Sequence, residues 1–301
     1  VYPLTKRHGD DVLGELLGLS PAETAVYLKD PRLANLTFRD FLFIDTETTG
    51  LAGAGTIAFM VGVAFFERSG ENEVLVVRQY FLRDHGDEPA MLLLLDELLQ
   101  TYRGLISFNG RSFDLPLLDG RFLMNRLPND LLDRPHLDLL HPARRLWRRL
   151  LGYCALGSLE EPLLGVRRTH ADVPGFLIPG LYHDYLRSGD ARQMARVFYH
   201  NELDMVSMVT LATRVTRLLG VPEETTPPLD LFSLGKWQAD LGLAQAEQTL
   251  RLATAARLPL ADYHAALHQL GLLLKRGNRR EEAVIIWQQI AATSFDEIEA
   301  H

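Results

Sequence analysis

Three strand-like segments follow one another before the first long helix, and this order constrains the fold more than any other feature. The segments cover 41–48, 56–66 and 73–82. Each is rich in β-branched and aromatic residues, and turn residues separate them. Strands joined by such short connections favour an antiparallel meander.

Helices and strands alternate after the meander. The elements expected next are a helix over 89–102, a strand over 104–110, a helix over 112–126, a strand over 136–140, a helix opened by the capping-box spacing of Ser158 and Glu161, and a long helix from an N-capping Asp190 to Leu219. The order of these elements predicts an α/β fold, in which helices flank a mixed five-stranded sheet.

Four carboxylates lie inside segments that are otherwise apolar: Asp45 and Glu47 in FIDTETTGL, Asp114 in NGRSFDLPLL and Asp204 in YHNELDMVSM. Burying an ionised acid is costly unless it is paired or binds a metal. Asp45 and Glu47 are two apart on a strand, so their side chains leave the same face of the sheet. Asp114 and Asp204, on two helices, can close the cluster. Oxygen ligands of this kind select Mg²⁺ or Mn²⁺, and the pattern predicts a site for two such ions.

Each of the four acids also has a purely structural explanation. Asp45 can cap a turn after its strand, and Glu47 can be a solvated residue at a strand end. Asp114 can be the anion at the start of its helix, and Asp204 can face solvent. The occurrence of all three segments in one chain favours the metal site.

In order and spacing, these segments resemble the three exonuclease motifs of the DEDD nucleases in the ribonuclease H-like superfamily. Within that superfamily, 155–168, 172–190 and the following helix resemble the YprB-type ribonuclease H-like domain, so that the resemblance covers roughly residues 35–220. The resemblance implies a ribonuclease H-like fold. It also implies a metal-dependent exonuclease that degrades single-stranded nucleic acid from the 3′ end. DNA is expected as a slightly better substrate than RNA, and the shape of the pocket at the terminal nucleotide decides between them.

The residue expected to act as general base departs from the pattern of this family. DEDD nucleases have a Tyr four residues before the last Asp or a His five residues before it, whereas this chain has His200 and Tyr199 at those spacings. Residues four apart share a helix face, so His200 is expected beside Asp204. Imidazole can accept a proton near neutral pH, which favours His200, with Tyr199 as the alternative. A histidine with a structural role on the helix face is a further alternative.

Substrate contacts are expected on the loops that follow the motifs. The resemblance implies that a terminal nucleotide meets the residues around the first motif: Thr46, Thr48, Thr49, Gly50 and Leu51. Asn109 is expected either to bind substrate or to cap the helix that follows it.

Charge is unevenly distributed along the chain. The formal net charge is −8, yet residues 101–200 hold 14 Arg against 10 Asp or Glu. This basic segment contains ARRLWRR at 143–149, with Arg144 and Arg145, and also Arg111, Arg121, Arg126, Arg167 and Arg168. It predicts a phosphate-binding surface, and a solvated helix face is the alternative.

Changes in composition, above all a Pro- and Thr-rich stretch, divide the chain into four parts. These are an N-terminal segment of short helices over 1–40, the nuclease-like domain over 41–220, a linker over 221–230, and a helical region over 231–301. A loose repeat at 233–250 and 269–287 resembles tetratricopeptide-like helical hairpins, which implies a protein partner. A plain helical extension is the alternative.

The remaining features bear on the cellular compartment, and two rival functions stay open. The single cysteine, Cys154, excludes an internal disulfide and a Cys-based zinc cage, and the cytoplasm is expected. No apolar run predicts a membrane span, and the oligomeric state stays open. An endonuclease for RNA:DNA hybrids is one rival function, and an inert nucleic-acid-binding scaffold is the other.

Overall fold

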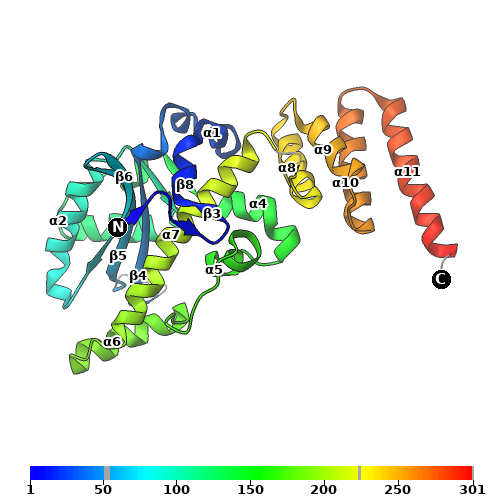
Figure 1. Ribbon diagram of the computed structural model, residues 1–301. Coiled ribbons are helices and arrows are strands. Elements are labelled where there is room, and N and C mark those ends of the chain that lie inside the picture. The colour runs from blue at the N-terminus through cyan, green and yellow to red at the C-terminus, as the bar shows by residue number, and fades with distance from the viewer. Residues whose placement is uncertain (51–54, 223–224, 300–301) are drawn as a thin grey trace. The chain divides into compact units, whose positions relative to one another are not determined.

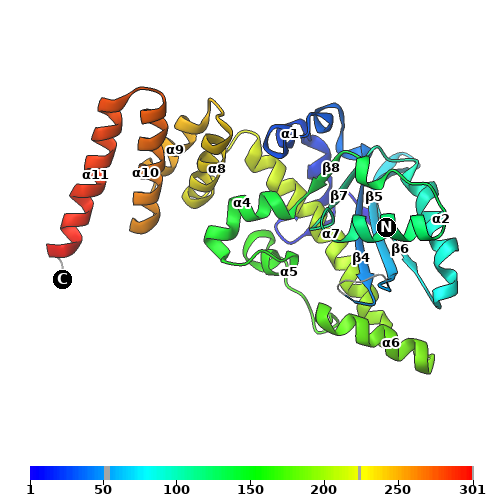
Figure 2. The same ribbon diagram turned by 180° about the vertical axis from the view of Figure 1, so that it is seen from behind.

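The computed structural model describes residues 1–50, 55–222 and 225–299 (Figures 1 and 2). The strands are β1 Tyr2–Pro3, β2 Arg7–His8, β3 Asp11–Val12, β4 Phe41–Thr48, β5 Ala58–Ser69, β6 Asn72–Phe81, β7 Gly104–Ser107 and β8 His136–Asp138. The helices are α1 Ala22–Leu28, α2 Glu88–Leu99, α3 Asp114–Met124, α4 Leu140–Leu151, α5 Leu156–Leu159, α6 Ile178–Ser188, α7 Met194–Leu219, α8 Pro228–Leu241, α9 Ala246–Ala255, α10 Leu260–Arg276 and α11 Arg280–Glu299. The chain forms two compact units, the first made of Val1–Pro142 with Cys154–Arg217, and the second of Ala143–Tyr153 with the residues from Leu218 onward.

The first unit is built on a mixed sheet of six strands in the order β1-β6-β5-β4-β7-β8. The pairs β1-β6, β6-β5 and β5-β4 are antiparallel. The pairs β4-β7 and β7-β8 are parallel. The α/β class and the helices that flank a mixed sheet are confirmed. The predicted number of five strands was wrong, because Tyr2–Pro3 pairs with Val74 and Leu75 and adds a sixth.

The N-terminal segment differs from the expected run of short helices. It holds β1 and a small hairpin of β2 and β3, followed by 3₁₀ turns and the short helix α1. Strands of two residues are too short for the alternation of apolar and polar side chains that reveals a strand in a sequence. This segment contributes an edge strand to the sheet on which the site is built.

Strand β4 lies in the middle of the sheet, and both of its faces are covered. Phe41, Leu42, Phe43 and Ile44 are fully buried, as expected for a central strand of a sheet that is covered on both faces. Asp45 stands opposite Gly62 of β5, and Gly62 stands opposite Gln79 of β6. The register shifts between Glu47 and Thr48, where β4 ends.

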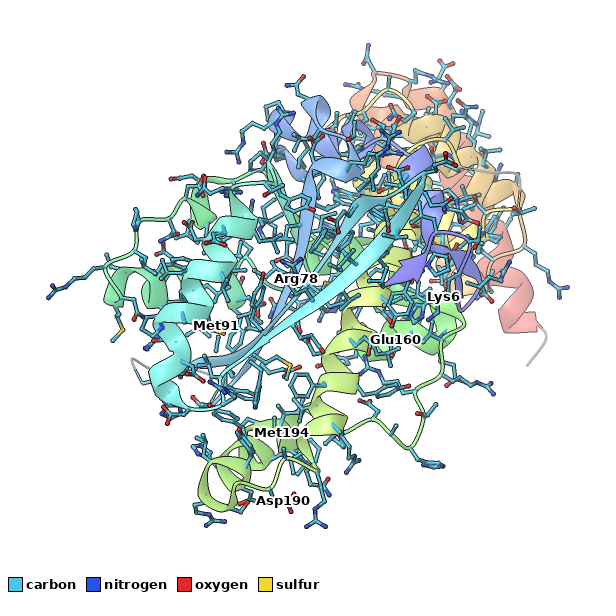
Figure 3. The ribbon with its side chains drawn as sticks, turned by 60° about the vertical axis from the view of Figure 1, so that its left-hand side comes forward. Lys6, Arg78, Met91, Glu160, Asp190 and Met194 are labelled. Carbon is cyan, nitrogen blue, oxygen red and sulfur yellow. The ribbon has the colours of Figure 1, made fainter. Side chains whose placement is uncertain are left out.

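The predicted helices lie where expected, with shifted ends. The long helix α7 begins at Met194 rather than at Asp190, and Figure 3 labels both residues at this end of the helix. Asp190 accepts a hydrogen bond from the Arg192 N–H outside α7. Ser158 is not an N-cap, because α5 has already begun at Leu156, although its hydroxyl accepts a hydrogen bond from the N–H of Ala155 at 2.9 Å.

The main core packs α2, α3, α6 and α7 against the sheet. Phe59 of β5 stacks on Tyr182 of α6 with ring centroids 3.9 Å apart, and both side chains are fully buried. The Tyr182 hydroxyl donates to the carbonyl of Leu82 at 3.1 Å. Burying such a ring contributes about 1.5–3 kcal/mol, so this pair fixes α6 firmly on β5.

The second unit is helical and has its own core, formed by α8, α9, α10 and α11. Gly271 lets α11 approach α10, since a Cβ at this position would stand 2.2 Å from Nε1 of Trp287. Pro228 to Asp230, expected in the linker, form the start of α8. Among the described residues, no helix is both long enough and apolar enough to cross a membrane.

Candidate active site

The four predicted acids meet at one place in the first unit. Asp45 and Glu47 project from β4, Asp114 is the first residue of α3, and Asp204 lies in the middle of α7. Burial and the neighbouring charges of the cluster raise the pKa of Asp45 and of Glu47 well above the usual range. Burial also raises the pKa of Asp204, although Arg168 and His200 oppose that rise. Acids that disfavour one another's ionised forms in this way are stabilised either by protonation or by a bound cation.

Asp114 is held by the strand beside it. One of its oxygens, Oδ1, accepts hydrogen bonds from the Thr46 N–H at 3.1 Å and from the Thr46 hydroxyl. Burial raises the pKa of Asp114 to about 6, while these hydrogen bonds act in the opposite direction. Thr46, expected to contact substrate, is itself buried and positions Asp114.

Asn201 holds Asp45 from the other side of the site. Its Nδ2 donates to Oδ2 of Asp45 at 3.0 Å, and its Oδ1 accepts from Nε2 of Gln79 at 3.0 Å. A Cβ at Gly62 would stand 2.1 Å from Asn201 Oδ1, so only glycine leaves room for this amide. Asp45, Gly62 and Gln79 therefore form one row across three strands beneath α7, which crosses the sheet in Figure 1.

His200 lies beside Asp204, one helical turn away, as the spacing predicts. Its Nε2 is 3.5 Å from Oδ2 of Asp204, and its Nδ1 is 2.8 Å from Oδ1 of Asp172. Burial acts to raise the pKa of Asp172, but hydrogen bonds from His200 and from the Val173 N–H outweigh it and leave that pKa below its usual value. Tyr199 points elsewhere, with its hydroxyl 3.3 Å from Thr169 Oγ1.

Arg168 is the cation that stands closest to these acids. Its guanidinium donates to both oxygens of Glu160, at 2.5 and 2.9 Å, and it also donates to Oδ1 of Asp204. The side chain is only 19% exposed, and that of Glu160 is 1% exposed. Arg168 therefore does not belong to a phosphate-binding surface, which corrects the role that the basic segment predicted for it.

The loop after β7 is tied to the end of β8. The backbone N–H groups of Asn109 and Arg111 donate to the two oxygens of Asp138, at 2.8 and 3.0 Å. Asn109 adopts a left-handed backbone with φ of 69°, and its side chain is exposed. A Cβ at Gly110 would stand 2.3 Å from Ser107 Oγ, so the loop needs glycine there.

The segment after β4 closes on β5 through Thr49. The Thr49 N–H donates to the carbonyl of Ile57 at 3.0 Å, and its hydroxyl accepts from the Ile57 N–H at 3.1 Å. The Thr48 hydroxyl donates to the carbonyl of Gly50 at 2.7 Å. Leu51 lies outside the described residues.

Much of the basic segment forms ion pairs within the chain. The pairs are Arg121 with Glu88, Arg134 with Asp130, Arg145 with Asp240, Arg149 with Asp262 and Arg167 with Glu161. Arg144 and Arg145 belong to the second unit. Arg111, in the loop after β7, is exposed.

The donor chemistry of the cluster fits divalent cations. Its oxygens come from four nearly buried carboxylates, and Glu47 makes no side-chain hydrogen bond to any residue that the structure describes. In the arrangement observed, no three His, Cys, Asp or Glu side chains of the described chain are placed to hold one ion together. Asp204 is turned to Arg168, and it would have to reorient to join the other ligands.

The fold and the site define the class of the protein. The family model of the RNase_H superfamily matches residues 42–216, and the chain belongs to this superfamily. Its relative YprB of Bacillus subtilis (strain 168), an uncharacterized protein, is 32% identical over 307 residues, which cover 96% of this chain and 70% of that protein.

Two solved structures show a weaker likeness. One is the family B DNA polymerase of Pyrobaculum calidifontis, with 14% identity and a TM-score of 0.43 over 78% of this chain. The other is the zinc-bound complex of Escherichia coli ExoI with single-stranded DNA, with 16% identity and a TM-score of 0.36 over 52% of this chain. The chain spans 29% and 42% of the lengths of those proteins.

Sequence reasoning missed several residues that support the site. Asn201 lies three residues before Asp204, and this helical spacing could have revealed it. Asp172 and Glu160 carried no such signal, because their partners on α7, His200 and Ser207, are distant in the sequence.

Proposed function

We propose that this protein is a divalent-cation-dependent exonuclease of the DEDD type, which hydrolyses single-stranded nucleic acid from the 3′ end. The observation that carries the proposal is the group of four largely buried acids on β4, α3 and α7, in which burial and the charges of the other acids raise the pKa of Asp45 and of Glu47. DNA is slightly favoured over RNA as the substrate. The chemistry of the acids alone leaves the direction of digestion open, and that part of the proposal rests on the motif resemblance.

Asp45, Glu47, Asp114 and Asp204 would hold two ions, Mg²⁺ or Mn²⁺. When bound, such ions would neutralise the phosphate and stabilise the charge that develops during in-line displacement. Thr46 and Asn201 fix two of the carboxylates in place, so that the ligand oxygens are oriented before substrate arrives.

His200 is assigned as the general base. Its Nδ1 lies against Asp172, and this contact orients the ring so that Nε2 faces Asp204. An imidazole oriented by a carboxylate can take a proton from the attacking water and pass it to solvent. Tyr199, with its hydroxyl at Thr169, is the weaker candidate.

Substrate contacts are proposed for the exposed loop after β7. Asn109 presents an exposed side chain there, and Arg111 adds a positive charge two residues away. Thr48, Thr49, Gly50 and Leu51 remain candidates for the terminal nucleotide. Arg144 and Arg145 remain proposals for phosphate binding in the second unit.

The proposal is tested with matched single-stranded DNA and RNA oligonucleotides labelled at the 5′ end. Each is incubated with Mn²⁺, Mg²⁺ or EDTA, and the products are resolved on a gel. A metal-dependent ladder that shortens from the 3′ end, absent with Asp204→Ala, is expected. Asp184→Asn is a matched control, because Asp184 is an exposed acid on α6 whose carboxylate pairs with Arg187 of the same helix.

Two outcomes would support the rival functions. Internal cuts in an RNA:DNA hybrid, with single strands left intact, would identify a hybrid endonuclease. Intact substrates under every condition, with oligonucleotide binding preserved, would favour a scaffold. The intact set of four acids argues against a scaffold, because a non-catalytic protein has no use for mutually repelling buried carboxylates.

A protein-binding role is proposed separately for the second unit. Consecutive helices α8 to α11 pack around a shared core, which is the arrangement expected of tetratricopeptide-like hairpins. A pull-down with 225–301 as bait would not test this, because the unit also includes Ala143–Tyr153. The full chain is the appropriate bait.

A further inference from the structure

Arg168 occupies an unusual position for a cation, because it stands in the site that we propose to bind divalent ions. It is largely buried, and three carboxylates accept hydrogen bonds from it: Glu160, Asp172 and Asp204. The His200 ring also lies beside it, with Nδ1 3.1 Å from Nη1 of Arg168. An arginine this deeply placed is held by its partners, because a buried charge without a counter-charge is costly. Its partners therefore indicate what the side chain does.

Glu160 anchors the guanidinium. It accepts two hydrogen bonds from Arg168 and a third, at 2.7 Å, from the Ser207 hydroxyl on α7. Ser207 is in turn 2.9 Å from Nε2 of His8. Burial and the charges of Lys6 and Arg168 lower the pKa of His8 to about 4, so that its ring is neutral and can donate to Ser207. Glu160, labelled in Figure 3 beside α7, thus sits at the centre of a fixed network.

The charge of Arg168 is balanced by Glu160 rather than by the four acids of the cluster. Glu160 neutralises Arg168 through a two-pronged contact, which leaves Asp45, Glu47, Asp114 and Asp204 with up to four negative charges. Two divalent ions supply four positive charges. Nη2 of Arg168 extends beyond Glu160 and donates to Oδ1 of Asp204.

We propose that Arg168 is a positioning residue that serves as a resident counter-ion for Asp204, and that a divalent ion binds there by displacing this guanidinium contact. The inference rests on the cation site of the proposed function. Arg168 holds the Asp204 carboxylate in place and balances its charge until an ion binds. Because the ion must displace this contact, Arg168 lowers the affinity of the site for metal. Its anchor on Glu160 lets the guanidinium leave Asp204 without becoming an uncompensated charge.

The test compares Arg168→Gln with Arg167→Gln in the full chain. Arg167 is the adjacent arginine, 80% exposed and paired with Glu161 on the surface, so its variant removes the same charge outside the network. Calorimetric titration measures the Kd for Mn²⁺, and thermal unfolding is followed in EDTA and in Mn²⁺. Arg168→Lys is included in case Arg168→Gln does not fold, because lysine keeps the charge but loses the forked contact.

The expected result is a Kd for Mn²⁺ that falls roughly tenfold in Arg168→Gln, since a charge-assisted hydrogen bond no longer competes with the ion. Arg168→Lys is expected to fall between the parent and Arg168→Gln, and Arg167→Gln to stay within about twofold of the parent. The melting temperature of Arg168→Gln should be lower in EDTA, and Mn²⁺ should raise it by more than in the parent.

Equal or weaker Mn²⁺ binding in folded Arg168→Gln and Arg168→Lys would overturn the inference, because it would mean that Arg168 helps to build the site without competing for it. A parent protein that binds no Mn²⁺ would overturn it as well. If the Kd shifts as expected and no oligonucleotide is hydrolysed, the result supports displacement of Arg168 from Asp204 by the ion. The same result contradicts the proposed exonuclease activity. The two proposals can therefore be separated with the same preparations.

Discussion

Replacing Asp114 by asparagine should stabilise the metal-free protein at neutral pH. The pKa of Asp114 rises from 3.8 in the unfolded chain to about 6 in the folded protein, chiefly because the carboxyl is buried. Asparagine has nearly the same shape, is neutral at every pH, and can still accept the hydrogen bonds from Thr46. The variant therefore imitates the protonated acid.

The sign and size of the effect follow from the pKa difference. Below pH 3.8 the acid is protonated in both states, so the substitution gains nothing. Above about pH 6 it is ionised in both, and the folded state then bears the full cost of about 3 kcal/mol, at ~1.4 kcal/mol for each pKa unit. The gain in free energy of unfolding should appear between pH 4 and 6 and persist above it. At pH 7.5 it corresponds to a melting temperature higher by about 6–10 °C.

Thermal unfolding in EDTA at pH 4 and pH 7.5 measures this gain. Asp119→Asn, which removes a partly exposed acid from the same helix, is the matched control and should change stability by less than about 0.5 kcal/mol. With Mn²⁺ the advantage of Asp114→Asn should shrink or reverse, because the parent gains a bound ion. A difference that is the same at both pH values, or a less stable variant at pH 7.5 in EDTA, would refute the reasoning.

Three further changes probe the supports of the site. Gly62→Ala should cost about 1–3 kcal/mol in urea unfolding, because the new Cβ collides with Asn201, and unchanged stability would contradict the close approach described here. His200→Gln should lower the single-turnover rate about 10²–10⁴-fold with oligonucleotide binding preserved, and a loss below about tenfold would place proton transfer elsewhere. Asp138→Asn should loosen the backbone at Asn109 and raise KM severalfold, as measured by steady-state digestion, whereas an unaltered KM would separate this loop from substrate.

The sequence predicted the architecture of the first unit well because its main strands are long enough to show their composition. Strands β4, β5 and β6 carry runs of eight or more residues, whereas Tyr2–Pro3 has no periodicity that could identify the sixth strand. The limits of α7 were less accurate, since Asp190 caps a turn that ends before the helix begins.

Within the site, local spacing predicted which residues meet on one element, but not which distant residues hold them. His200 lies beside Asp204 because four residues make one helical turn. Arg168, by contrast, was assigned to a phosphate-binding surface from its charge alone. Its burial depends on Glu160, which is itself held by Ser207, a residue that the fold brings from a separate segment.

The contact between His8 and Ser207 has a consequence for how the molecule assembles. It joins positions 199 residues apart, and the neighbouring Asp10 N–H donates to the carbonyl of Leu164, so the start of the chain packs against its middle. Contacts of such high sequence separation form late in folding, because a long loop must close before they contribute. In a ribosome-bound chain that has emerged only as far as Ser207, helix α7 is incomplete, so Asp204 is not yet held in place. The contacts of Ser207 with His8 and Glu160 have not formed either. The cluster of acids should therefore be complete only after most of the chain has been synthesised, and any activity that depends on it should appear only then.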